Sequence, residues 1–168
     1  MPKDRVFVAT SPVEDEPRRK GQRESAFMIT INPQKSWQSE RQAGFQEMQT
    51  RLKALSNYLL RKKTILSLLQ FPKEEVKDGV KIPRQVLLGR IDEISKDRVA
   101  SCEWGSKQGR LHVHIYLAIK HRSFIRLDVA KIREIAATLL KVPAEGLHLD
   151  IQASSPSLRD YVMKGVDQ

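Results

Sequence analysis

The chain has 168 residues, enough for one domain with a substantial hydrophobic core. Its formal net charge of +10 favours a polyanionic partner such as nucleic acid, because each cation that neutralises a phosphate releases condensed counterions. The single cysteine, Cys102, excludes an internal disulfide and a multi-cysteine zinc site. No apolar run approaches the roughly 18 residues of a membrane span, and no signal peptide is evident. We therefore expect a soluble intracellular protein with no membrane partner.

The N-terminal segment, residues 1–25, is polar, contains prolines and lacks sustained periodicity. These features predict a flexible arm, followed by a folded domain over residues 26–168. The first ordered element is predicted at residues 26–32, a short apolar and β-branched run that Pro33 ends. We therefore expect the folded domain to begin with a strand.

Helical patterns follow this strand. An amphipathic helix is predicted from apolar residues at helical spacing, which are Phe45, Met48, Leu52, Leu55 and Leu59. The apolar segment 58–71 predicts a second helix that ends before Pro72. Residues 73–83 are charged and contain Gly79, which indicates a loop or an insertion.

The next part of the chain has the character of strands. Residues 86–91 and 98–104 each predict a strand, and residues 105–109 have the composition of a hairpin turn. Residues 110–119 alternate strictly, so one face should carry apolar residues, which are Leu111, Val113, Ile115, Leu117 and Ile119. The opposite face should carry His112, His114, Tyr116 and Ala118.

The remaining elements are an amphipathic helix, a short strand and a terminal helix. They are predicted at residues 129–139, at 147–151 and from residue 155 or 157 to Gly165. The complete order is strand, helices, three strands, helix, strand, helix. This order predicts a single α+β domain with an antiparallel sheet that helices cover.

Glu103, His112 and His114 form a candidate metal site. Residues two apart in a strand point to the same face, and the predicted hairpin brings Glu103 back beside His112. Two imidazoles and a carboxylate leave positions open on Mg²⁺, Mn²⁺ or Zn²⁺, and such an ion polarises a phosphate. A lone pair of surface histidines often has no function. The apolar alternation around this pair and the carboxylate on the preceding strand favour a metal site.

Tyr161 and Lys164 are a candidate catalytic pair, because a spacing of three places both on one face of the terminal helix. A tyrosine hydroxyl has a pKa of about 10 and attacks phosphorus only when a metal or a nearby ammonium activates it. The competing interpretation is a half-buried aromatic beside a lysine at a helix C-terminus. These two residues alone favour that second interpretation.

Three segments in order resemble the motifs of replication initiators from circular single-stranded DNA viruses and related plasmids. The first is residues 27–33, and the second is residues 111–117, a histidine pair between bulky apolar residues. The third is residues 161–165, a tyrosine followed three residues later by a lysine, and Glu103 precedes the histidines at a similar distance. The chain is therefore similar to the HUH endonuclease domain of a rolling-circle replication initiator (Rep).

The resemblance implies a fold and a reaction. The fold is a sheet of about five antiparallel strands with RRM-like topology, in which Glu103, His112 and His114 bind Mn²⁺ or Mg²⁺. The reaction is sequence-specific nicking and joining of single-stranded DNA at an origin hairpin, in which Tyr161 forms a 5′-phosphotyrosine bond with the help of Lys164. The motifs fit a virus or a plasmid equally well.

The resemblance also concerns the rest of the protein and its location. Full-length relatives usually add a C-terminal helicase domain, which we expect to be absent from this chain and through which the full-length protein would oligomerise. A eukaryotic virus would place the protein in the host nucleus.

The sequence is also compatible with two other functions. A non-catalytic single-stranded nucleic-acid-binding module of similar topology would need aromatic residues exposed on the sheet, for which Tyr116 and Trp104 are the candidates. A plasmid relaxase shares the nicking chemistry but usually carries more histidines. The basic residues that we expect to contact phosphates are Arg51, Lys53, Lys120, Arg122, Arg126, Lys131 and Arg133.

Overall fold

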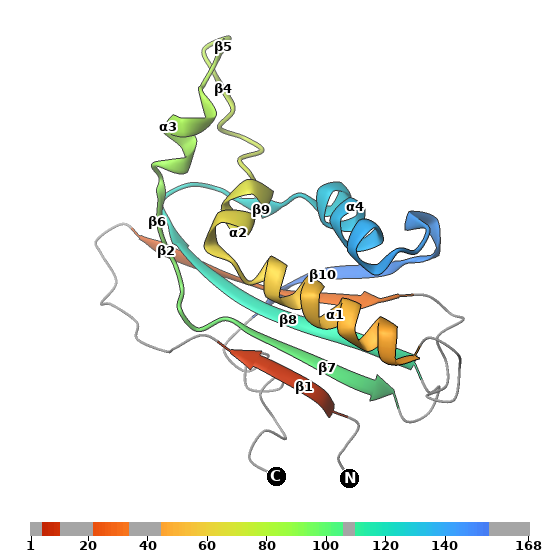
Figure 1. The fold of residues 1–168 in the computed structure, drawn as a ribbon. Helices are drawn as coiled ribbons and strands as arrows, with labels where there is room; N and C mark the ends of the chain where they lie inside the picture. Colours follow the sequence, from red (N-terminus) through yellow and green to blue (C-terminus); the bar gives the residue numbers. More distant parts are fainter. Residues whose placement is uncertain (1–4, 11–21, 34–44, 106–109, 155–168) are drawn as a thin grey trace.

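The computed structural model describes residues 5–10, 22–33, 45–105 and 110–154 (Figure 1). Fifteen elements lie within these ranges. The strands are β1 (Arg5–Thr10), β2 (Arg23–Asn32), β3 (Leu69–Gln70), β4 (Val76–Lys77), β5 (Val80–Lys81), β6 (Ile91–Ile94), β7 (Val99–Gly105), β8 (Arg110–His121), β9 (Arg126–Leu127) and β10 (His148–Ser154). The helices are α1 (Phe45–Leu59), α2 (Lys62–Leu68), α3 (Arg84–Leu88), α4 (Val129–Leu140) and the short 3₁₀ helix η1 (Ala144–Gly146).

One antiparallel sheet organises the chain. Its strand order is β1-β7-β8-β2-β10, so the 12-residue strand β8 lies at the centre. Strands β7 and β6 share one edge of β8: β7 pairs with the half that starts at Arg110, and β6 pairs with the end near His121. The predicted α+β class with an antiparallel sheet and flanking helices is therefore confirmed.

Helices α1, α2 and α4 lie on one side of this sheet, which we call the helix side (Figure 1). The alternating apolar residues of β8 point into the core between sheet and helices, and each of them is at most 1% exposed. The predicted stripe of α1 is buried there too: Met48, Leu52, Leu55 and Leu59 are fully buried. Burial of each such side chain contributes about 1.5–3 kcal/mol to the free energy of unfolding. The core therefore holds the apolar face of β8 toward the helices, and His112 and His114 lie on the opposite face.

The N-terminal segment differs from its prediction. Within the arm that we expected at residues 1–25, Arg5–Thr10 forms the edge strand β1, which pairs with β7 from Arg5 opposite Glu103 to Thr10 opposite Val99. Strand β2 also begins earlier than expected, at Arg23. The run Val6-Phe7-Val8 has high strand propensity, and pairing with β7 provides backbone hydrogen bonds that the isolated pattern could not reveal.

The region between α2 and β7 contains the other differences. Residues 84–88 form helix α3 rather than the predicted strand. Pro83 is the N-cap of this helix, with a φ of −58° and a ψ of 141°, so the chain is extended immediately before the helix begins. The predicted loop at 73–83 contains a small hairpin of β4 and β5, in which Gly79 adopts a φ of 78°. The predicted terminal helix lies outside the described residues.

Candidate metal centre

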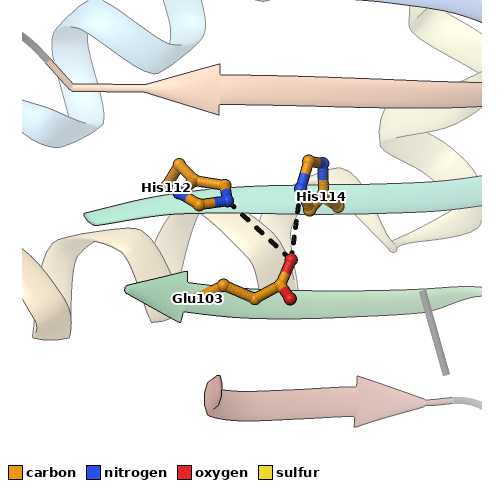
Figure 2. Close-up of side chains that lie close together, drawn as sticks. All are labelled: Glu103, His112 and His114. Atoms are coloured by element: carbon orange, nitrogen blue, oxygen red, sulfur yellow. Dashed lines mark ion pairs between the residues drawn. The ribbon is translucent and has the colours of Figure 1, made fainter. Parts of the chain in front are cut away.

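The pairing of β7 with β8 brings the three predicted ligands together. Glu103 lies directly opposite His112 in the register, and His114 lies opposite Ser101. His112 and His114 alternate with the buried residues Leu111, Val113 and Ile115, so their rings project from the face of the sheet away from the helices. Figure 2 shows the carboxylate of Glu103 directed at both imidazoles. The structure thus produces the cluster that the hairpin pattern predicts.

The distances within the cluster are short. Glu103 Oε2 lies 3.1 Å from His114 Nε2 and 3.8 Å from His112 Nε2. The two imidazole rings meet edge to face, with centroids 4.9 Å apart and an interplanar angle of 79°. The side chains of Glu103, His112 and His114 are 21%, 19% and 17% exposed, so the cluster is mostly shielded from water but remains accessible.

This geometry fits a divalent cation. One ligand atom from each residue lies within 4.8 Å of the other two. Ligands bound at about 2.1 Å with angles of about 90–110° are about 3.0–3.4 Å apart, so small side-chain rotations suffice to enclose an ion. The two imidazoles suit Mn²⁺ or Zn²⁺ better than Mg²⁺, which prefers oxygen ligands. Across the part of the chain that the structure describes, no second group of three such ligands occurs.

Thr30 positions one of the ligands. It lies opposite His114 in the pairing of β2 with β8, and its Oγ1 is 2.9 Å from His114 Nδ1. A neutral imidazole whose Nδ1–H donates to Thr30 keeps the lone pair of Nε2 free for a metal, and Nε2 is the atom that faces Glu103. We did not predict this role. The signal for it in the sequence is the position of Thr30 between the apolar residues Ile29 and Ile31.

Cys102, although next to Glu103, does not belong to the cluster. Its side chain is fully buried in the core on the helix side, because adjacent residues of a strand point to opposite faces. Burial, with a smaller contribution from the Glu103 carboxylate, raises the pKa of the Cys102 thiol to about 12. The thiol therefore stays protonated at neutral pH, and it lies on the face of β7 opposite the cluster.

The chain has three tyrosines, and two of them are described. Tyr116 lies on the same face as the histidines but is only 4% exposed, packed with Met28, Val99 and Ala118. Tyr58 lies on α1, on the helix side, with the guanidinium of Arg61 5.6 Å from its ring centroid. Tyr161, like Lys164, lies outside the described residues.

Four of the predicted phosphate contacts are carried by the helices. Arg51 and Lys53 lie on α1, and Lys131 and Arg133 lie on α4. Arg51 pairs with Glu47, and Arg133 donates to the backbone carbonyls of Ala144 and Leu147. The sheet separates these helices from the metal centre. These four residues therefore lie on a different surface of the molecule from the metal centre.

The other three lie at or beyond the end of β8. Lys120 is 4% exposed, and its ammonium lies 3.8 Å from Glu93, so it does not present its charge at the surface. Arg122 is exposed, pairs with Asp92 at 2.9 Å and donates to the carbonyl of Gly89. Arg126 is exposed and donates to Gln70. DNA contact by any of these residues remains a prediction.

Comparison with known proteins identifies no relative. No family model matches the chain. No curated protein and no solved structure matches it either. Among the described residues, no helix is long and apolar enough to cross a membrane.

Proposed function

We propose that the chain is an HUH-type endonuclease that nicks and rejoins single-stranded DNA at a replication origin and so initiates rolling-circle replication. The observation that supports this proposal is the convergence of Glu103, His112 and His114, whose ligand atoms lie within 4.8 Å of one another on the central strands of an antiparallel sheet. The RRM-like topology and the C-terminal helicase domain of a full-length protein belong to the same proposal, as does a location in the host nucleus if the protein comes from a eukaryotic virus.

The proposed reaction is a transesterification in which Tyr161 is the nucleophile. Glu103, His112 and His114 would hold a divalent ion, Mn²⁺ or Mg²⁺, which would supply Lewis-acid polarisation of the scissile phosphate. The Tyr161 oxygen forms a bond to phosphorus, the bond from phosphorus to the 3′-oxygen breaks, and the tyrosine proton ends on that 3′-oxygen. The products are a 5′-phosphotyrosine and a free 3′-hydroxyl. Attack by a 3′-hydroxyl on the phosphotyrosine reverses these steps and joins DNA.

Lys164 has a supporting role in this reaction. Its ammonium stabilises negative charge on the tyrosine oxygen and on the phosphate while the new bond forms. A nucleophile on a helix beside a phosphate fixed on the sheet also needs little further ordering to reach the transition state. Replacement of Lys164 should therefore slow cleavage less than replacement of Tyr161.

The described tyrosines support Tyr161 as the nucleophile. Tyr116 shares the face of the metal centre, but its side chain is buried. Tyr58 lies on the other side of the sheet. The burial of Tyr116 also weakens the alternative of a non-catalytic binding module, because that module needs the ring exposed for base stacking. A relaxase shares the proposed chemistry and differs in its substrate.

The test is the formation of a covalent adduct on a labelled single-stranded oligonucleotide, with Mn²⁺ or with EDTA. We expect an adduct with the wild type in Mn²⁺, no adduct in EDTA, and none with Tyr161→Phe in either buffer. Tyr58→Phe is the matched control and should form the adduct normally. Peptide mapping that places the label on Tyr58 or Tyr116 would overturn the assignment, and adduct formation in EDTA would refute the metal's role.

A further inference from the structure

A cavity lies at the far end of β8 from the metal centre. Its volume is about 290 Å³, and its walls come from the start of β2, the end of β8 and the segment that leads to β9. The residues that line it are Arg23, Glu24, Ser25, His121, Phe124 and Ile125. A volume near 300 Å³ is at the lower end of the range for small-ligand sites, so the cavity suits a single nucleotide rather than a larger molecule.

Phe124 is the aromatic feature of this cavity. Its side chain is 46% exposed, and it is the exposed aromatic residue among those whose side chains are described. Its position is fixed, because its backbone N–H donates to Glu74 Oε1 at 3.1 Å and Lys73 Nζ lies 5.2 Å from the ring centroid. A fixed and exposed ring beside cations is the arrangement on which a nucleobase stacks.

The floor of the cavity is polar but uncharged. His121 is only 3% exposed, its Nδ1–H donates to the carbonyl of Ser123, and its Nε2 lies 2.7 Å from Ser25 Oγ. Ser25 therefore donates its own proton to His121 and keeps oxygen lone pairs to accept a hydrogen bond from a ligand. Burial lowers the pKa of His121, which keeps the imidazole neutral. Such a floor offers hydrogen bonds to the edge of a base.

The charged residues around the cavity indicate which charge a ligand should carry. Arg23 lines the cavity and is exposed, and Arg122 and Arg126, both exposed, flank Phe124 in the sequence. Glu24 also lines the cavity, while Glu74 is paired with Arg90 at 2.9 Å. Arg122 is paired with Asp92 at 2.9 Å, so the cations that outnumber Glu24 around the ring are Arg23, Arg126 and Lys73. The rim therefore favours a phosphate.

We propose that this cavity binds one nucleotide of single-stranded DNA, with the base stacked on Phe124 and the phosphate at Arg23. The inference rests on the proposed function, which makes single-stranded DNA the substrate. It adds a binding subsite that is separate from the metal centre. None of the phosphate contacts predicted from the sequence includes Arg23, and none of the predicted stacking residues is Phe124.

The position of the cavity limits which DNA can reach it. His121 is seven residues along β8 from His114, which corresponds to about 23 Å at about 3.3 Å per residue. Ser25 and His121 also alternate with the residues of the metal face, so these two lining side chains lie on the helix side at the end of the sheet. A strand held at both places passes around that end. The bound nucleotide is therefore several nucleotides from the nick.

The experiment measures dissociation constants by fluorescence anisotropy for three oligonucleotides: a short one that covers the nick, and two that extend it in the 5′ or the 3′ direction. We expect Phe124→Ala to weaken binding of one extended oligonucleotide by about 5- to 150-fold, the effect of removing an aromatic that stacks on a base. Phe124→Tyr should keep the affinity, since it retains the ring. Val80→Ala is the matched control, because Val80 is an exposed apolar residue, 66% exposed, that does not line the cavity.

A second variant tests the phosphate contact. Arg23→Gln should reduce the slope of log affinity against log salt for the same extended oligonucleotide by about one, the value for one lost phosphate contact. Equal affinity of wild type and Phe124→Ala for all three oligonucleotides would overturn the inference alone, provided that the wild type binds and nicks. A loss of the same size on the short and extended oligonucleotides would also overturn it, because the nucleotide would not be distant from the nick. A wild type that neither binds nor nicks single-stranded DNA would refute the proposed function itself.

Discussion

His114 and His121 lie on the same strand, and one ring nitrogen of each contacts a hydroxyl group. Each imidazole meets a hydroxyl on the neighbouring strand β2: His114 Nδ1 lies 2.9 Å from Thr30 Oγ1, and His121 Nε2 lies 2.7 Å from Ser25 Oγ. The two residues differ at the second ring nitrogen. Nε2 of His114 faces the Glu103 carboxylate at 3.1 Å, whereas Nδ1 of His121 donates to the backbone carbonyl of Ser123.

This difference assigns the two histidines different roles. His121 uses both nitrogens within the fold and is 3% exposed, so it has no lone pair to offer a metal. His114 uses one nitrogen for orientation and directs the other toward a carboxylate and a second imidazole, in a cluster that remains accessible. The comparison teaches that the alternation of β8 places the two histidines on opposite faces of the sheet, with His121 on the face of the core residues. The group opposite the second nitrogen then separates the candidate ligand from the structural histidine.

The largest expected effect comes from removal of both metal-site imidazoles. His112→Ala combined with His114→Ala should lower metal-dependent cleavage by about a thousandfold or more, because the scissile phosphate loses its Lewis acid. The fold should remain, since both rings lie outside the hydrophobic core and a typical point substitution lowers the free energy of unfolding by about 1 kcal/mol. His148→Ala is the control, because His148 is an exposed histidine on β10. Undiminished nicking by the double variant in metal-depleted buffer would contradict the proposed centre.

Thr30→Val should have a smaller effect on the same site. It keeps the β-branched shape but removes the acceptor that holds His114 Nδ1, and loss of such an outer partner lowers metal affinity by about 10- to 100-fold. Thr30→Ser should restore most of the affinity, because it retains the hydroxyl. Thr50→Val is the control, since the Thr50 hydroxyl bonds only its own helix, at the carbonyl of Gln46. Unchanged Mn²⁺ affinity in calorimetric titration of Thr30→Val would show that Thr30 does not orient His114 for metal binding.

His121→Ala should affect the fold rather than the metal. It leaves the Ser123 carbonyl and the Ser25 hydroxyl without their partner in a buried position, at a cost of about 1–2 kcal/mol in the free energy of unfolding. Urea denaturation measures this loss, and Mn²⁺ affinity should equal that of the wild type. A fall in Mn²⁺ affinity with unchanged stability would contradict the structural role of His121 and indicate a role in metal binding.

The smallest effect concerns pH. Burial lowers the pKa of His121 below its usual 6.5, and Arg23 adds to this, while the hydrogen bond to Ser123 and the charges of Asp92 and Glu74 oppose it. As pH falls through about 6.5, His121 binds a proton in the unfolded chain but stays neutral in the folded chain. The contribution of neutral His121 to the free energy of unfolding is therefore fully present above pH 6.5. It declines as pH falls from there toward the lower pKa of the folded state. In denaturation series, wild type should lose stability over this window and His121→Ala should lose less. Parallel curves for the two proteins would exclude His121 as the source.

The sequence predicted that Glu103, His112 and His114 meet because the alternation of β8 is local. Apolar residues at every second position bury one face, and this places His112 and His114 together on the other. The hairpin composition of residues 105–109 then predicted that Glu103 returns beside them, and the register confirms Glu103 opposite His112. The same reasoning predicted α1 and its buried stripe.

The features that we missed depend on pairing between distant segments. The bond from Thr30 to His114 joins residues 84 apart and needs the register of β2 on β8. Strand β1 exists through its pairing with β7, and the cavity at Phe124 needs β2, β8 and the following segment together. Short patterns cannot specify such contacts, because a shift of one residue in a strand moves every side chain to the other face.

The central claim, that Glu103, His112 and His114 hold one divalent ion while His121 does not, is tested most directly by counting bound metal. Mn²⁺ titration followed by electron paramagnetic resonance should give one tightly bound ion per chain for the wild type, for His121→Ala and for His148→Ala. His114→Ala and Glu103→Gln should lose that ion. One bound ion that persists in His114→Ala, or one that disappears in His121→Ala, would contradict the account.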